Sequence, residues 1–439
     1  MGCLGLLAWF GVGIACADVS IRRDLPPGLH VPAAAQPGPQ FDVARATEAW
    51  LALLSTEQRA QSDAYFEGGY WLELWSLLYG LGVMAILLWS GVSRRLRDLA
   101  ERASRQPWLS VAIYGAAFLV ATFVLNLPLS IYQDFLREHQ YGLSNLSFPG
   151  WLGEQLIGLA LAVVLGSAAI ATIYALLRRA GRRWWVWATG LAFVFTLFLD
   201  LIEPLLIAPL FNDYKPLAPG PVRDAVLSLA RANEVPTDHV EWFDASKQTT
   251  RISANVSGLG GVARISLNDN LLNRTSLPEI RAVLGHEIGH YVLNHPLKLG
   301  VYFTLLYGIA FAIAAWALEA ALARWGATLA LRDRADPAAL PLLVAIFSIV
   351  WFLLTPFTHT VVRSVEAEAD AFGLNAAREP EGFAMSAIRL STYRKLRPGA
   401  LEELVFYNHP SGYERVRRAM IWLNENQNAA PAVSALPGQ

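Results

Sequence analysis

The sequence predicts a mainly α-helical membrane bundle joined to a small α+β domain. Of its 439 residues, 54% are hydrophobic and 16% are charged, whereas soluble domains average about 25% charged residues. Long apolar stretches alternate with two more polar segments, 209–298 and 361–426. The net charge of −1 supplies no basic field for nucleic acid, so we expect no nucleic-acid partner.

The first 17 residues are apolar but too short for an ordinary membrane span. Ala15, Cys16 and Ala17 have the small-x-small form of a signal-peptidase site, although no basic region precedes the apolar stretch. Residues 1–17 are therefore a signal peptide, a short uncleaved anchor or a lipoprotein signal ending at Cys16. We expect residues 18–70 to form an extracytoplasmic segment. The chain has 2 cysteines, both near its start, which excludes thiolate metal sites elsewhere.

Six later stretches are long and apolar enough to cross a membrane as helices, which takes about 20 residues. The first four make up a four-span region, 71–208, and the last two form a hairpin, 299–360. The six predicted spans are 71–92, 109–132, 153–177, 184–208, 299–322 and 338–360.

Arginines cluster in the loops that follow the first, third and fifth predicted spans. If all six spans cross, these loops share one side of the membrane, and the short loop 133–152 opposite them holds only Arg137. The positive-inside rule puts the arginine-rich loops in the cytoplasm. We therefore expect a multi-pass protein of the cell inner membrane with both polar segments on the periplasmic face.

The polar segment 209–298 has a mixed pattern. Residues 221–233 have the apolar periodicity of an amphipathic helix, and 239–243 and 263–268 are typical of short strands. Gly258, Gly260 and Gly261 predict a turn or bulge between strands. Residues 278–294 predict a further helix with proline and glutamate in its first turn. The last residues, 427–439, have the composition of a disordered tail.

Residues 286–290 read HEIGH. On a helix, His286 and His290 share a face, so both imidazoles can bind one metal ion. Glu287 lies beside them, where it can act as general base on a zinc-activated water that attacks a peptide carbonyl. The alternative is a helix that carries two histidines by chance. We expect one Zn²⁺ per chain and the hydrolysis of peptide bonds.

A catalytic zinc usually has three protein ligands and one open position. Glu366 is the best third candidate, because it follows His290 after two predicted spans, which return the chain to the same side of the membrane. Glu368 and Asp370 compete for this role, but Glu366 and Asp370 share a helix face, whereas Glu368 points away. One of the facing pair can bind zinc while the other orients a histidine. The alternative is an ordinary acidic helix start.

Three further features are less specific. His409 and Arg415 come together if a helix starts at Ser411, and they can then stabilise an oxyanion; equally, they can be a loop histidine and a surface arginine. Residues 253–261 can form an edge strand that pairs with an extended substrate, or a structural hairpin. His295 is more typical of a helix end than of a metal ligand.

The sequence resembles the type I CAAX prenyl endopeptidase family of integral-membrane zinc proteases over residues 109–420. The HEIGH motif is shared by many zinc proteases, so the other matches are more specific. These matches are LPLS at 127–130, PLFNDYKPL at 209–217, DASK at 244–247, SAN at 253–255, Arg363 with Glu366, Ala369 and Asp370, and His409 and Pro410 with Arg415.

This resemblance implies a role for each matching residue. His286, His290 and Glu366 would bind zinc, and Glu287 would be the catalytic base. Asp370 would lie next to the metal ligands, Asn255 would bind substrate backbone, and His409 and Arg415 would lie near the scissile bond. The resemblance also implies a chamber enclosed by the membrane helices, and removal of the last three residues from a prenylated cysteine terminus.

The sequence departs from the family pattern in two ways. Glu368 replaces a usual glutamine, which we expect to change little because it faces away from the metal. The arginine-rich loops put the catalytic domain outside, whereas the family's topology would put it in the cytoplasm. We therefore expect membrane-associated or misfolded polypeptides, either lipid-modified or not, as substrates. The alternatives are a quality-control protease of broad specificity, a catalytically silent scaffold and a transporter; the last should show inverted repeats, which the sequence lacks.

Overall fold

The computed structural model describes residues 28–258 and 263–427. The predictions for residues 1–17 and, apart from Gln427, for the tail 427–439 lie outside this range. The chain divides into two compact units. Within the described residues, the apolar unit comprises Trp71–Phe211 and Gly300–Thr358. The polar unit comprises 28–70, Asn212–Leu299 and 359–427.

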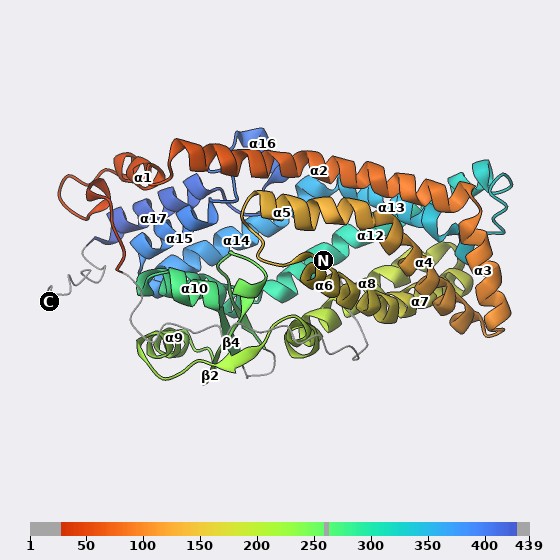
Figure 1. The fold of residues 1–439 in the computed structure, drawn as a ribbon, viewed down its shortest axis with the longest axis horizontal. Coiled ribbons are helices and arrows are strands. Elements are labelled where there is room, and N and C mark those ends of the chain that lie inside the picture. The colour runs from red at the N-terminus through yellow and green to blue at the C-terminus, as the bar shows by residue number, and fades with distance from the viewer. Residues whose placement is uncertain (1–27, 259–262, 428–439) are drawn as a thin grey trace. The chain divides into compact units, whose positions relative to one another are not determined.

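The apolar unit is helical, as its composition predicts (Figure 1). Three of its helices, α2, α12 and α14, also contain residues of the polar unit. The helices are α2 (Thr56–Trp89), α3 (Val92–Ala103), α4 (Pro107–Ser130), α5 (Arg137–Gln140), α6 (Phe148–Leu161), α7 (Ser167–Ala180), α8 (Trp184–Ile202), α12 (His295–Trp325), α13 (Leu340–Leu353) and α14 (Thr355–Ala377).

Four helical stretches of the described chain are long and apolar enough to cross a membrane, or five if a bent pair counts as one. They are Thr56–Trp89, Pro107–Gln140, Phe148–Leu210 and His295–Trp325, with Pro337–Leu353 and Thr355–Ala377 as the bent pair. The predicted spans 153–177 and 184–208 fall within one 63-residue stretch. This stretch contains α6, α7 and α8, and Gly181, with φ +55°, separates the last two.

Small residues let the helices of the apolar unit approach closely. A Cβ atom on Gly115 of α4 would lie 3.3 Å from the Cα of Ser167, and one on Gly166 would lie 3.0 Å from the Leu119 side chain. Large apolar side chains such as Trp187 and Trp316 remain exposed. Small residues at helix contacts and apolar residues on the outside are the pattern of helices packed within lipid.

Two of the arginine-rich loops meet within the apolar unit. Arg97 Nη1 lies 2.8 Å from the buried Asp336 carboxylate, and Arg332 Nη1 lies 2.6 Å from Glu101. The loop after the first predicted span and the loop after the fifth therefore lie at the same end of the unit. This agrees with the expectation that they share one side of the membrane.

The polar unit contains a four-stranded sheet in the order β1-β2-β4-β3. The strands are β1 (Tyr214–Pro216), β2 (His239–Phe243), β3 (Ala254–Ser257) and β4 (Arg264–Asn268). β2 and β4 are parallel, whereas β1 and β3 run antiparallel to their neighbours. β3 lies at the edge of the sheet and pairs antiparallel with β4, so the edge strand and the structural hairpin considered for 253–261 occur together. The two strands predicted over 239–243 and 263–268 are confirmed.

Helices cover this sheet and form a second core. The helices predicted over 221–233 and 278–294 are confirmed. In Figure 1, α9 and α10 lie beside the strands, while α1, α15 and α17 lie together. The remaining bounds are α1 (Val43–Leu51), α9 (Pro221–Ala232), α10 (Asp269–Arg274), α11 (Leu277–Val292), α15 (Pro380–Leu390), α16 (Ala400–Phe406) and α17 (Gly412–Asn426).

Candidate metal centre

α11 carries the HEIGH sequence and has a well-defined start. The Glu279 carboxylate accepts hydrogen bonds from the backbone N–H and the hydroxyl of Ser276, both at 2.7 Å. Arg389 of α15 pairs with the same buried carboxylate. These contacts fix the first turn of the helix, and further along the helix the two histidines share one face. His286 Nε2 and His290 Nε2 lie 3.1 Å apart.

α14 brings Glu366 to these histidines. Glu366 Oε2 lies 3.3 Å from His286 Nε2, and Glu366 Oε1 lies 3.5 Å from His290 Nε2. One ligand atom from each of the three residues falls within 4.8 Å of the others. Asp370, one turn further along α14, is fully buried, and its Oδ1 lies 2.9 Å from His286 Nδ1. The structure thus brings together the three metal ligands predicted from the sequence.

The donor set fits zinc. If His286 donates its Nδ1 hydrogen to Asp370, its neutral ring presents an Nε2 lone pair to the other ligands. The facing atoms are then electron-pair donors: two imidazole nitrogens and a carboxylate oxygen. Such donors repel one another unless a proton or a metal cation lies between them, and two histidines with one glutamate are a known ligand set of catalytic zinc.

Glycines let α11 and α14 approach closely. A Cβ atom on Gly373 would lie 2.7 Å from the backbone nitrogen of His286, and one on Gly285 would lie 3.0 Å from the carbonyl oxygen of Gly373. Real Cβ atoms essentially never come within 3.0 Å of such neighbours. The carboxylate side chains of α14 reach the histidines of α11 because the backbones of these two helices are in close contact.

Gly373→Ala is expected to force these helices apart. We expect the free energy of unfolding to fall by about 1–3 kcal/mol, the usual cost of an overpacked contact, and zinc content to fall with it. Thermal unfolding and metal analysis of the purified protein measure both. Gly69→Ala is the matched control, because Gly69 is helical and a Cβ atom there would meet nothing within 4 Å. Equal stability of the two variants would contradict the close-approach argument.

Glu287 lies beside the ligand cluster without joining it. It forms no hydrogen bond or ion pair within the described part of the chain. Its burial raises the pKa of its carboxyl to about 7, and the nearby His286 opposes this effect less strongly. A carboxyl that titrates near neutral pH can both take and return a proton. These features suit the general base predicted at this position.

Arg415 and His409 come from the C-terminal region. Ser411 precedes α17 and caps it, as predicted, through a hydrogen bond from the backbone N–H of Glu414. The buried Arg415 donates to Asp370 at 3.0 Å and to Glu366 at 3.1 Å. His409 Nε2 lies 3.3 Å from Glu366 Oε2. Burial lowers the pKa of His409 to about 3, so its imidazole is neutral at physiological pH.

Asn255 lies on the edge strand β3, and α11 contacts this strand. Its side-chain oxygen is buried and accepts no hydrogen bond in the described structure. A buried acceptor without a donor costs free energy, so this oxygen has an unused capacity to accept a hydrogen bond.

Sequence reasoning missed three contributors to this site. Gly373 was not singled out, because a helix contact cannot be read from local pattern. Arg418 lies 3.4 Å from the Asp370 carboxylate, which Arg415 also contacts; its spacing of three residues from Arg415 was the available signal. His295, treated as a helix-end residue, is fully buried and contacts His290.

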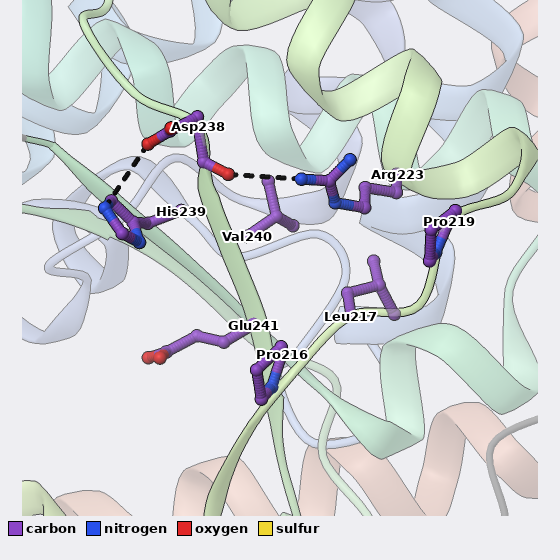
Figure 2. Close-up of a pocket in the computed structure, with 8 residues that line it drawn as sticks. All are labelled: Pro216, Leu217, Pro219, Arg223, Asp238, His239, Val240 and Glu241. Carbon is purple, nitrogen blue, oxygen red and sulfur yellow. Dashed lines mark hydrogen bonds and ion pairs between the residues drawn. The ribbon is translucent and has the colours of Figure 1, made fainter.

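A surface hollow of about 350 Å³ lies elsewhere in the polar unit, against β1 and β2 (Figure 2). Figure 2 shows Asp238 paired with His239 and Arg223 donating to the backbone carbonyl of Asp238. The hollow contains no predicted site residue and lies at the opposite edge of the sheet from Asn255. It is lined by Pro216, Leu217, Pro219, Arg223, Asp238, His239, Val240 and Glu241.

Two family models match consecutive parts of the chain. Residues 43–213 match the CAAX prenyl protease N-terminal region, described as five membrane helices, and residues 216–422 match peptidase family M48. An uncharacterized metalloprotease of Bacillus subtilis, YhfN, is 31% identical over 76% of this chain and 79% of its own length. A CAAX prenyl protease 1 homolog of Oryza sativa is 26% identical over 70% of this chain and 72% of its own length.

A solved structure shares the fold. The crystal structure of S. mikatae Ste24p matches with a TM-score of 0.68 at 20% sequence identity, over 88% of this chain and 92% of that chain. The predicted fold class, a membrane helical bundle with a small α+β domain, is confirmed.

These matches, together with the apolar helices and the ligand cluster, define a multi-pass membrane metalloendopeptidase that acts on polypeptides. The chain belongs to peptidase family M48, among the type I CAAX prenyl proteases.

Proposed function

We propose that this protein is a zinc endopeptidase in which His286, His290 and Glu366 bind one Zn²⁺ and Glu287 is the general base. The convergence of three ligand atoms beside an unpaired, partly buried glutamate carries this proposal. The same observation argues against a catalytically silent scaffold, because such a protein has no need for a complete ligand set. Bound zinc would supply Lewis-acid activation of water and of the substrate carbonyl.

The surrounding residues of this chain would divide the remaining work. Glu287 would take a proton from the attacking water and deliver it to the departing amine. Asp370 would hold His286 through Nδ1, and Arg415 would hold both Asp370 and Glu366. Because the guanidinium of Arg415 is engaged with these carboxylates, its contacts favour a positioning role, whereas His409 has an imidazole edge directed to the ligand cluster.

We propose that β3 binds the substrate backbone in extended form, with Asn255 accepting a substrate N–H. Asn255→Ala is expected to raise KM by about 10-fold or less with a smaller change in kcat, since one hydrogen bond to a neutral group contributes about 0.5–1.5 kcal/mol. Steady-state cleavage kinetics measure the split. Ser257→Ala, on the same strand, is the control. A drop in kcat alone would count against a role in substrate binding.

The Oryza sativa relative is named as a CAAX prenyl protease 1 homolog, so a lipidated C-terminal peptide is one candidate substrate for this chain. A membrane-associated or unfolded polypeptide is the other. The experiment that tests the function is cleavage by the purified, metal-analysed protein of a farnesylated peptide, the same peptide without lipid, and unfolded casein. We expect cleavage that stops with a chelator and returns with zinc. A zinc-free, inactive wild type would refute the proposal, and cleavage of casein would identify broad specificity.

We also propose an inner-membrane location with the polar unit in the periplasm, on the basis of the arginine-rich loops. A single cysteine placed in the 93–107 loop of a protein without Cys3 and Cys16 should then resist membrane-impermeant maleimide in intact cells. It should react after lysis. Labelling of intact cells would instead indicate a cytoplasmic polar unit.

A further inference from the structure

His295 is a buried imidazole in contact with a metal-ligand histidine. α11 ends at Val292, and Asn294 adopts the left-handed conformation with φ +53° before α12 begins at His295. Asparagine tolerates this conformation better than most residues. The resulting turn carries the His295 ring back against α11, where its Nδ1 lies 2.9 Å from His290 Nδ1. The His295 side chain is only 1% exposed.

The other edge of the His295 ring contacts a carboxylate. His295 Nε2 lies 3.3 Å from Glu368 Oε2, and Lys298 Nζ donates to the same oxygen at 2.7 Å. The Glu368 side chain is 50% exposed and is not part of the three-residue ligand cluster. Through His295 it reaches His290.

Hydrogen-bonding rules assign a direction to this series of contacts. His290 directs Nε2 at the other ligands, so when it binds a metal ion through Nε2 its neutral ring carries the hydrogen on Nδ1. His295 must then accept that hydrogen with an unprotonated Nδ1, which leaves the hydrogen of its own neutral ring on Nε2. That hydrogen points at Glu368, an ionised acceptor held by Lys298. Each donor therefore meets an acceptor.

Different partners thus hold the two ligand histidines in place. His286 contacts the Asp370 carboxylate directly, whereas His290 reaches the Glu368 carboxylate through His295. Carboxylates or carbonyls that accept from ligand histidines fix the tautomer and the ring orientation, and their loss typically lowers metal affinity by about 10–100-fold.

We propose that His295 and Glu368 are positioning residues that hold His290 in its metal-binding tautomer and orientation. This inference rests on the proposed zinc site. His295→Leu removes both contacts and should weaken zinc binding by about 10–100-fold. His295→Asn places an amide oxygen where Nδ1 was, so it should restore much of the affinity. Glu368→Gln keeps an acceptor without the charge and should have a smaller effect than His295→Leu.

Zinc affinity of the full-length protein in detergent is measured by competition with a chromogenic chelator, alongside thermal unfolding of the zinc-free form. Cobalt substitution adds a second readout, because the visible absorption of bound Co²⁺ reports ligand geometry. A positioning role predicts altered zinc affinity and altered cobalt bands with little change in zinc-free stability. His239→Leu, at a histidine side chain that is 70% exposed, is the matched control and should change neither.

The outcomes distinguish failure of the role of His295 from failure of the proposed zinc site. If wild type binds no zinc, the metal site itself is wrong. If wild type binds zinc and His295→Leu binds it equally well, His295 does not position His290. If His295→Leu fails to fold, Glu368→Gln decides: wild-type affinity with an unchanged cobalt spectrum would overturn the role of Glu368 and the series of contacts that leads to it.

Discussion

Glu287→Gln should leave zinc bound while peptide cleavage falls by a factor on the order of 10²–10⁴, the usual contribution of a general base. The amide matches the carboxyl in size but cannot accept the proton. Because Glu287 makes no ion pair within the described chain, the substitution should disturb its neighbours little. Metal content and kcat of the purified variant, measured together, check both halves of this expectation.

Glu425→Gln supplies the control for Glu287→Gln, since Glu425 is exposed on α17. It should keep wild-type metal content and activity. Two results would contradict the assignment of Glu287: cleavage at the wild-type rate, or a loss of zinc equal to the loss of activity. The second would make Glu287 a ligand or a structural residue.

Glu366→Gln should lose zinc as well as activity. The substitution removes the charged ligand and takes a carboxylate partner from Arg415, which then retains Asp370. We expect zinc affinity to fall by more than the roughly 10–100-fold typical of an outer partner. Chelator competition measures this change, and added zinc at high concentration should restore part of the cleavage.

The comparison between Glu366→Gln and Glu287→Gln is informative because the two residues lie in one site. Rescue by zinc should occur for Glu366→Gln and not for Glu287→Gln. Full zinc binding by Glu366→Gln would show that Glu368 or Asp370 supplies the third ligand, the alternatives that the sequence left open.

The local pattern of the metal site was predictable because helix geometry depends on spacing alone. Two histidines four residues apart on a helix share a face in any protein, so His286 and His290 could be paired from the sequence. Glu366 required one further step, the return of the chain after two membrane spans. Both inferences use regularities that hold without knowledge of side-chain packing.

Contacts that depend on an irregular turn or on the packing of two helices were not predictable. The left-handed conformation at Asn294 turns His295 against His290, and no periodicity predicts that turn. Gly373 lies in a regular helix and is one of the chain's 33 glycines, and only the structure shows that its missing Cβ admits the backbone of His286. The contact between Glu368 and His295 depends on the same turn, so the sequence could not predict it; whether Glu368 changes little stays a prediction that Glu368→Gln tests.

Hydropathy located the membrane helices but not their ends. The first predicted span begins at residue 71, whereas α2 begins at Thr56, because the polar first part of the helix lies in the polar unit and contacts it. Tyr70, for example, donates a hydrogen bond to Glu402 at 2.8 Å. A hydropathy pattern locates the apolar part of a helix but does not predict where its polar part begins or ends.

The division of the metal ligands between α11 and α14 has a consequence for biosynthesis. A growing chain that has reached Val292 already carries both histidines and Glu287, yet it lacks Glu366, Asp370 and Arg415, which are translated much later. The peptidase therefore cannot assemble its centre until both helices of the 299–360 segment and the C-terminal helices have been made. If the proposed ligands are correct, we therefore expect the nascent protein to stay inactive until these helices have been made.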